Sequence, residues 1–176
     1  GFCIPDFKSC ADFKWVFGFK NKEDTLSEDL FTTKENIYTC KTVLNKKSQK
    51  GYALVRLDRP VKGRTPLKLR SRGKVAVGSS LVMAGFPNGL PMKVVDDAVV
   101  KEVFKNSFKA NLDAFGGNSG SPVFNLNTGL VEGILLEGES DYTFNRNRVC
   151  TEIKYCVPLF SSTPAVKVIF VSFSVQ

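Results

Sequence analysis

Short apolar runs recur along this chain at the spacing of an antiparallel β protein. Stretches such as "DRPVKG", "FPNGLP" and "NLNTG" lie between the runs, and clusters of Gly, Pro and Asn favour tight turns. We therefore predict an all-β protein, built as a sandwich or barrel, with no long helix and no internal repeat. The predicted strands span residues 13–19, 36–44, 52–57, 80–86, 98–104, 121–125, 129–138 and 150–157.

The C-terminal stretch differs from the rest of the chain. Residues 166–175 read "VKVIFVSFSV", a run with high β-propensity and a single charge. An exposed segment of this kind is prone to aggregate. We therefore expect it to be buried in a sheet, and its pattern does not resemble that of a terminal helix.

Charge is distributed unevenly. The 176 residues carry a formal net charge of +8, and no acidic residue occurs from Arg59 to Val95. This run suits either a polyanion-binding face or the solvent face of a strand, and the alternation in "LKLR", residues 67–70, favours the strand. Because Phe86 is the single aromatic residue in this run, too few aromatic groups interleave with the basic residues to stack on bases, and we expect no nucleic-acid partner. No apolar run reaches the ~20 residues of a membrane span, so we expect no membrane partner. The first residues have no signal-peptide pattern, which decides nothing about export.

The chain has five cysteines, an odd number. Cys3 and Cys10 lie close in sequence, as do Cys150 and Cys156, and we favour disulfides within such pairs over free thiols. Cys40 would then be left over. A metal site is the competing interpretation, but such a site normally needs four ligands at recognisable spacing, often with histidine among them, and the chain has no histidine. We therefore expect no metal and no cofactor.

The stretch "FGGNSGSPVFN", residues 115–125, carries the clearest candidate chemistry. Its glycines allow the backbone to turn sharply, which a serine nucleophile needs if neighbouring N–H groups are to point at a developing oxyanion. Ser119 is the candidate nucleophile. The alternative is an ordinary Gly- and Ser-rich turn between two strands.

Three motifs together resemble the trypsin-like (chymotrypsin-fold) serine peptidases, and among them the bacterial branch of glutamyl endopeptidases. The run "AFGGNSGSPVFN" with the following "GLVEGILLEG" is similar to the serine motif, "GYALVRLDRPV" to the aspartate motif, and "GFCIPDFKSC" to the histidine segment. The resemblance implies a chymotrypsin-like double β-barrel whose first barrel is incomplete at its N-terminus. It assigns residues 1–75 to the remnant of the first barrel, 76–160 to the second barrel, and 161–176 to a β-rich tail that we expect to cover the open edge of the first barrel.

Two of the three catalytic positions implied by the resemblance lack the catalytic residue. The histidine position falls on Phe2 and the aspartate position on Gly51, while Ser119 is retained. Serine is a poor nucleophile without a base in hydrogen-bond reach. Lys50 in a Ser–Lys pair would be another base, but nothing singles it out, and Asp58 is more simply explained as a turn residue. We therefore predict negligible peptidase turnover.

Residues that bind peptide in this family have counterparts here. The resemblance implies that the backbone N–H groups of Gly117 and Ser119 form an oxyanion hole. It places Asp113 at the floor of a primary specificity pocket, where a carboxylate favours Lys or Arg, although a loop residue satisfied by backbone donors is an equal alternative. The strand segment that would pair with a bound peptide comprises Leu135, Leu136, Glu137 and Gly138.

Three interpretations of function follow. The first is a catalytically inactive peptidase relative that binds a peptide or protein segment. The second is a truncated or altered form of an active secreted serine endopeptidase, which would cleave peptide bonds through an acyl-enzyme. The third is a basic, disulfide-containing binding module without enzymatic ancestry. The resemblance and the cysteines indicate a secreted or periplasmic protein, and we expect a monomer.

Overall fold

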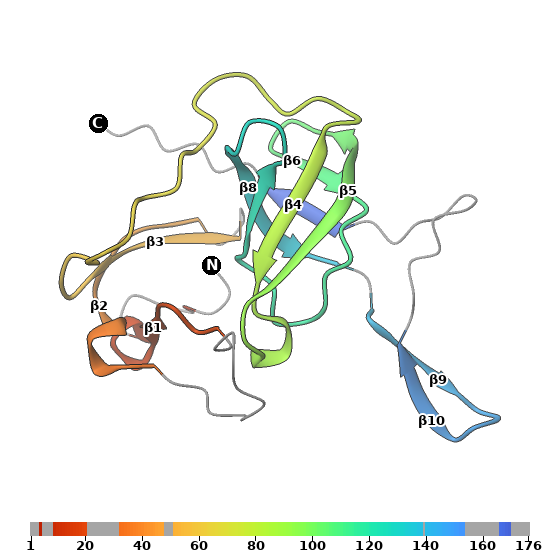
Figure 1. The fold of residues 1–176 in the computed structure, drawn as a ribbon, viewed down its shortest axis with the longest axis horizontal. Helices are drawn as coiled ribbons and strands as arrows, with labels where there is room; N and C mark the ends of the chain where they lie inside the picture. Colours follow the sequence, from red (N-terminus) through yellow and green to blue (C-terminus); the bar gives the residue numbers. More distant parts are fainter. Residues whose placement is uncertain are drawn as a thin grey trace. The chain divides into compact units, whose positions relative to one another are not determined.

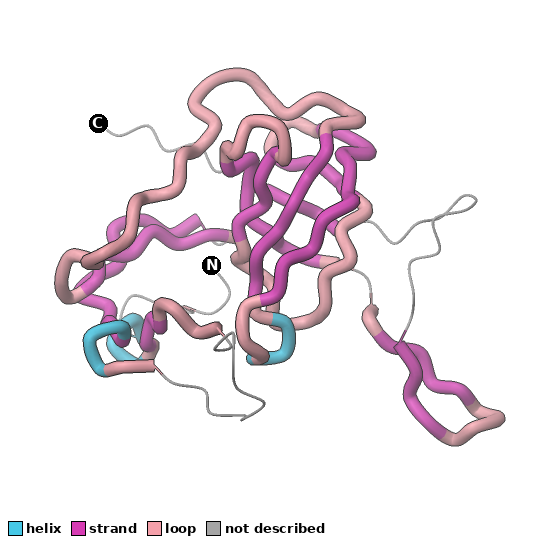
Figure 2. The backbone as a smooth tube through the Cα atoms, in the orientation of Figure 1, coloured by secondary structure: helices cyan, strands magenta, loops and turns pink. Residues whose placement is uncertain are grey.

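Almost all of the regular structure is β-strand (Figure 1). The computed structural model describes residue 4 and residues 9–20, 32–47, 51–138, 140–153 and 166–169. Within them the only helical segments are short 3₁₀ turns, as Figure 2 shows: η1 (Ser9–Asp12), η2 (Lys34–Asn36) and η4 (Pro87–Gly89). None of the described helices is long and apolar enough to cross a membrane. The chain divides into two compact units, Gly1–Pro66 and Leu67–Gln176.

The first unit contains a three-stranded antiparallel sheet in the order β1-β2-β3. Its strands are β1 (Lys14–Val16), β2 (Ile37–Lys47) and β3 (Tyr52–Leu57). A small core forms because apolar residues of the sheet pack against the segment around η1. Its members are Ile4, Cys10, Cys40 and Val43, with Phe13, Trp15, Ala53 and Val55 packed against them.

A disulfide joins Cys10 of η1 to Cys40 of β2, with their Cα atoms 5.5 Å apart. The predicted Cys3–Cys10 pair and an unpaired Cys40 are therefore wrong. The bond closes a loop with a sequence separation of 30 residues, which restricts the unfolded chain more than the short loop we expected. Cys150 is free and exposed, and Cys3 and Cys156 lie outside the described residues.

A closed six-stranded barrel, in the order β11-β6-β5-β4-β7-β8, forms the second unit. Inward-facing residues alternate along its strands, as β4 illustrates: Leu81 and Met83 are buried, and Val82 between them is only half-buried. This alternation buries one face of a closed sheet. The strands are β4 (Ser80–Gly85), β5 (Lys93–Val103), β6 (Ser107–Ala110), β7 (Pro122–Asn125), β8 (Val131–Glu137) and β11 (Val166–Ile169).

The C-terminal strand closes the barrel. β11 pairs on one side with β6, where Val166 lies opposite Ala110, and on the other with β8, where Ile169 lies opposite Ile134. Val168 is fully buried in the barrel core. The prediction that this apolar run enters a sheet is confirmed for Val166–Ile169. These residues cover an edge within the second unit, so the expectation that they cover the first barrel is wrong.

The hairpin of β9 (Tyr142–Asn145) and β10 (Cys150–Ile153) forms a separate two-stranded sheet (Figure 1). Tyr142 lies opposite Ile153, and Phe144 lies opposite Thr151. Side chains of directly opposed residues share a face, so one face of the hairpin is largely apolar. β9 and β6 were not among the predicted strands.

Four residues of the basic run make contacts within their own unit. In the first unit, Arg59 pairs with Asp58 and Arg64 lies over the Phe17 ring. In the second, Arg70 pairs with buried Glu132, and Lys74 donates to the carbonyl of Phe104.

The expected strand alternation in residues 67–70 is wrong. Leu67 and Leu69 are 55% and 36% exposed, while Arg70 reaches Glu132. The segment forms only a single parallel bridge, between Leu69 and Val131. Of these four side chains only that of Arg70 turns inward, toward the buried carboxylate of Glu132.

Candidate functional site

The loop around Ser119 has backbone conformations that require glycine. Gly117 and Gly120 have φ values of 89° and 94°, in the region where L-residues with a side chain are strained. A Cβ atom at Gly117 would also lie 2.7 Å from the backbone nitrogen of Asn88. The glycines of the motif thus permit both the turn and the close approach of the loop to η4.

Backbone hydrogen bonds tie the loop to β8. The N–H of Gly120 donates to the carbonyl of Leu135 (2.7 Å), and the N–H of Leu135 donates to the carbonyl of Ser121 (2.9 Å). Inside the loop, the N–H of Ser121 donates to the carbonyl of Asn118 (2.9 Å). These bonds fix the position of Ser119 relative to the C-terminal half of β8.

A second anchor holds the loop at Gly116. Its N–H donates to Oδ2 of Asp141 (2.7 Å), and its carbonyl accepts from the N–H of Asn88 (2.8 Å). Next to Asp141, the Tyr142 ring lies 6.1 Å from that of Phe115, and Nδ2 of Asn88 donates to the Tyr142 hydroxyl (3.4 Å). Nothing in the sequence indicated this anchor, because Asn88 and Asp141 lie far from the loop along the chain.

Two backbone N–H groups of the loop have no hydrogen-bond acceptor among the described residues and can therefore donate to a ligand. Among the described residues, the amides of Gly117 and Ser119 donate to no acceptor, whereas those of Gly116, Asn118 and Gly120 all do. Gly117 and Ser119 are both exposed. Unpaired amides flanking one residue of a glycine-rich turn are suited to bind a carbonyl oxygen or an anion.

Ser119 has an exposed side chain whose Oγ donates to the carbonyl of Leu136 (3.2 Å). No side chain of a described residue accepts a hydrogen bond from it. A backbone carbonyl is a negligible base, so this bond orients the hydroxyl without activating it.

The two other positions suggested by the motifs lie in the first unit. Phe2 and Lys50 are outside the described residues. Gly51 is buried in the turn before β3 and has a φ of 76°. The glycine therefore has a conformational role of its own in connecting β2 to β3.

Asp58 takes part in the structure of the first unit. Its Oδ1 accepts from the N–H of Thr39 (2.9 Å), and its Oδ2 accepts from Arg59 (2.7 Å). The hydrogen bond from Thr39 is the main cause that lowers the pKa of Asp58, and Arg59 lowers it further. These contacts account for Asp58 without any catalytic role.

We predict that Asp58→Asn lowers the urea midpoint of unfolding at about pH 7 and that the difference from the unchanged protein shrinks toward about pH 3. A carboxyl whose folded pKa is lowered contributes stability above its unfolded pKa, and this contribution is lost as the pH falls through the folded pKa. Asp12→Asn is the control, since Asp12 is exposed in the same unit and has no partner among the described residues. A pH-independent difference for Asp58→Asn would contradict the prediction.

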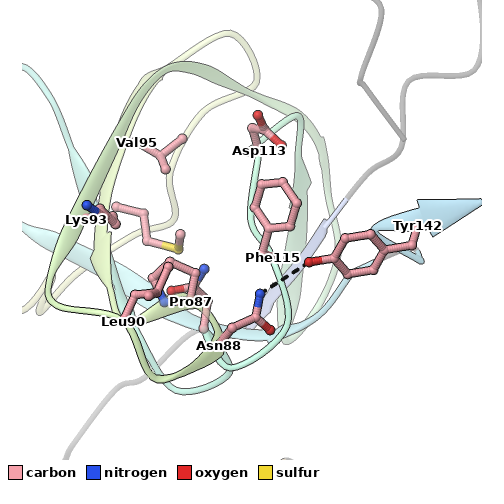
Figure 3. A pocket seen from close by; sticks show the side chains of 10 residues that line it. Pro87, Asn88, Leu90, Lys93, Val95, Asp113, Phe115 and Tyr142 are labelled. Atoms are coloured by element: carbon pink, nitrogen blue, oxygen red, sulfur yellow. Dashed lines mark hydrogen bonds between the residues drawn. The ribbon is translucent and has the colours of Figure 1, made fainter. Parts of the chain in front are cut away.

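A pocket of about 350 Å³ lies beside the loop (Figure 3). Asp113 lines it, and no described backbone N–H donates to Asp113, so the local-donor alternative for this residue finds no support. Ser119 and residues 135–138 do not line the pocket, so the structure does not bring Asp113 together with them there. The lining residues are Met83, Pro87, Asn88, Leu90, Lys93, Val95, Asp113, Phe115, Asn118 and Tyr142.

Comparisons with known proteins agree with this architecture. The sequence profile of the family described as "Trypsin-like peptidase domain" matches residues 15–134. The fold is similar to the crystal structure of the Rv3671c protease from M. tuberculosis in its active form, with a TM-score of 0.56 and 17% identity over 76% of this chain and 54% of that one.

Two further structures of the Rv3671c protease are also similar in fold. The inactive form gives a TM-score of 0.55 and 16% identity, covering 78% of this chain and 64% of that one. The inactive form of a serine-to-alanine mutant gives 0.52 and 16%, covering 78% and 62%. This chain therefore spans only 54–64% of the length of these solved chains. No curated protein matches the sequence.

Proposed function

Because this chain belongs to the trypsin-like peptidase family, we propose that it is a catalytically inactive member that binds peptide or protein segments at the site around Ser119. Its all-β fold is consistent with the chymotrypsin-like double barrel of the family. The observation that carries the proposal is the contact of Ser119 Oγ, which is hydrogen-bonded to a backbone carbonyl and to no described side chain.

The residues at the expected histidine and aspartate positions, Phe2 and Gly51, support inactivity on chemical grounds. Phenylalanine cannot accept the serine proton, and glycine cannot orient a base. A triad enzyme that loses one member keeps roughly 10³–10⁴-fold acceleration over water from its oxyanion hole and binding groups. The same residual binding groups are what a peptide-binding protein needs.

The free amides of Gly117 and Ser119 support peptide binding. They offer two donors for a peptide carbonyl next to the end of β8. β7 pairs with β8 up to Ile134, and the serine loop bonds to both backbone groups of Leu135. Leu135 of the expected peptide-pairing segment is therefore bonded to the loop, and we propose that a peptide strand aligns along the residues that follow, Leu136 to Gly138. We expect Asp113 to favour peptides with Lys or Arg, by charge pairing.

A fluorophosphonate probe tests inactivity directly, because it reacts with an activated serine. We expect no labelling of Ser119 after incubation at neutral pH, measured by intact mass, while an active trypsin-like peptidase is labelled under the same conditions. Labelling that disappears in Ser119→Ala would show that the serine is activated and would refute the proposal.

Peptide binding needs its own measurement. Fluorescence anisotropy with a library of short peptides should reveal binders, and those with Lys or Arg should bind more tightly than peptides with Glu at the same position. Asp113→Asn should reduce this preference. If no peptide binds to the unchanged protein, the binding half of the proposal fails, whatever the outcome with the probe.

A second candidate is an altered form of an active secreted serine endopeptidase. Family membership and the preserved serine loop favour it. Restoring Phe2→His together with Gly51→Asp, and assaying cleavage after Lys, Arg and Glu, tests whether the rest of the chain is competent, and cleavage after Glu would support the glutamyl-endopeptidase branch. The third interpretation, a module without enzymatic ancestry, is wrong because the chain belongs to the peptidase family.

The Cys10–Cys40 disulfide and the family fit an extracellular or periplasmic protein. Disulfides persist in oxidising compartments and are rare in the cytosol. We propose secretion or a periplasmic location on this basis.

A further inference from the structure

The pocket beside the loop has the character of a ligand site. Its volume of about 350 Å³ lies at the small end of the roughly 300–1,000 Å³ typical of small-molecule sites. Figure 3 shows Val95, Leu90, Pro87 and the ring of Phe115 around the pocket. Apolar and aromatic walls with few polar groups are what such sites generally present.

One wall contains a buried polar atom without a partner. Asn118 is 2% exposed, and its Oδ1 accepts no hydrogen bond from any described residue. A buried carbonyl oxygen that has lost its water and gained no donor is costly. Oδ1 faces Gly85 of β4, where a Cβ atom would lie only 2.2 Å from it. Because the side-chain amide of Asn rotates with little restriction about its last torsion, a half-turn exchanges Oδ1 and Nδ2 and presents Oδ1 to a donor inside the pocket that Asn118 lines.

This pocket excludes Ser119 and the β8 segment of the proposed peptide site, although Asp113, to which we assign the Lys or Arg preference of that site, also lines the pocket. Its barrel residues come from β4 and β5, whereas Ser119 Oγ contacts β8, and β7 lies between β4 and β8 in the barrel. The pocket shares the loop with the peptide site, but it lies toward the other strands.

We propose that the pocket binds an uncharged aromatic ring that carries a single N–H or O–H donor, such as an indole or a phenol. The donor satisfies Oδ1 of Asn118. The ring packs against Phe115 and the thioether of Met83, both of which interact favourably with aromatic groups. The source of the ring is either a free small molecule or a Trp or Tyr side chain of a polypeptide.

The charges around the pocket favour an uncharged ligand. Lys93 and Asp113 lie on different sides of the pocket in Figure 3 and have opposite charges. Both are exposed, so they are solvated at its border, while the buried group is a neutral amide. A charged ring would lose its hydration without a buried counter-charge.

Indole and N-methylindole form the decisive pair of probes, because they differ in the donor and hardly in the aromatic body. With the unchanged full chain, titration by calorimetry or saturation-transfer NMR should show that indole binds about tenfold more tightly than N-methylindole, since the methyl group leaves Oδ1 unpaired. Equal affinity of the two compounds, or no binding of either, would overturn the proposal without any variant having to fold.

Two variants locate the binding site. Leu90→Ala removes an apolar side chain of the pocket and should weaken indole binding severalfold. Leu126→Ala removes a leucine of similar exposure outside the pocket (56% against 50%) and should leave binding unchanged. Equal effects of the two substitutions would place indole elsewhere and overturn the proposal.

A third variant and a peptide complete the test. Asn118→Leu should abolish the difference between indole and N-methylindole, and a persisting tenfold difference would show that Asn118 is not the acceptor. A short glycine-flanked Trp peptide distinguishes the sources, since tighter binding than free indole indicates a polypeptide and weaker binding a small molecule. The outcome is independent of the fluorophosphonate experiment, because no step depends on Ser119. It is distinguished from the peptide-library experiment because Asp113, which that experiment varies, is unchanged in every variant used with indole.

Discussion

Gly117→Ala is expected to destabilise the second unit by about 3 kcal/mol and to abolish peptide binding at the Ser119 site. Two physical effects combine there. A side chain at a φ of 89° is strained in any surroundings. The new Cβ would also meet the backbone nitrogen of Asn88 at 2.7 Å and the carbonyl oxygen of Phe86 at 3.1 Å. These are backbone atoms, so the collision cannot be relieved by a change of rotamer.

Gly129→Ala is the matched control for this substitution. Gly129 also has a positive φ, 67°, but no atom of a described residue lies within 4 Å of the Cβ it would gain. Gly129→Ala should lower the free energy of unfolding only by the cost of backbone strain, about 1 kcal/mol. The variant should keep the peptide affinity of the unchanged protein. Urea unfolding and fluorescence anisotropy measure the two quantities. Equal destabilisation by the two substitutions would mean that the loop moves freely away from η4, which would remove the basis for a fixed pair of amides.

The loop around Ser119 was the part of the site most open to prediction from sequence. Its turns depend on the positive φ values of Gly117 and Gly120. These backbone conformations favour glycine, so the turns can be recognised from the glycines in the sequence. The contacts of Asn88 and Asp141 with the loop could not be recognised from the sequence in this way. These two residues reach Gly116 only because the barrel brings η4 and the segment before β9 next to the loop.

Strands were predictable where apolar runs were long enough. β3 and β4 are largely apolar runs of six residues, and their predicted bounds agree with the structure to within one residue. β6 and β9 have four residues each and contain polar residues, so no run of four to eight apolar positions marked them.

Two errors arose because the sequence does not reveal spatial neighbours. Cys10 pairs with Cys40, which is distant along the chain, rather than with nearby Cys3. Arg70 turns inward because β8 presents a buried carboxylate at Glu132. In both cases tertiary packing decided the outcome.

Arg70→Met should destabilise the protein by about 3 kcal/mol, because it leaves the Glu132 carboxylate buried without its partner. The Glu132 side chain is fully buried, and that of Arg70 is 24% exposed. The guanidinium binds both carboxylate oxygens, through Nε to Oε2 and through Nη2 to Oε1 (2.8 Å). The hydrogen bond to Glu132 also raises the pKa of Arg70, so the guanidinium stays protonated.

Substitution of the partner residue, and the double variant, distinguish the loss of the ion pair from the cost of leaving a charge buried. Glu132→Leu should cost less than Arg70→Met, since the Arg70 side chain already reaches solvent and can extend further toward it. Arg70→Met combined with Glu132→Leu should come within about 1 kcal/mol of the unchanged protein, because apolar residues of similar size often replace a buried ion pair without loss. Arg72→Met, at an exposed arginine with no described side-chain partner, is the control and should change the urea midpoint little.

The double-mutant cycle also tests how the segment before β4 is held. The N–H of Arg70 donates to the carbonyl of Val131 (3.0 Å), and the N–H of Val131 donates to the carbonyl of Lys68 (2.8 Å), so backbone bonds and the ion pair attach this segment to the start of β8 together. If the ion pair fixes the attachment, the two single substitutions will be strongly non-additive. Additive losses would instead show that the backbone bonds hold the segment alone and that the pair contributes no coupling.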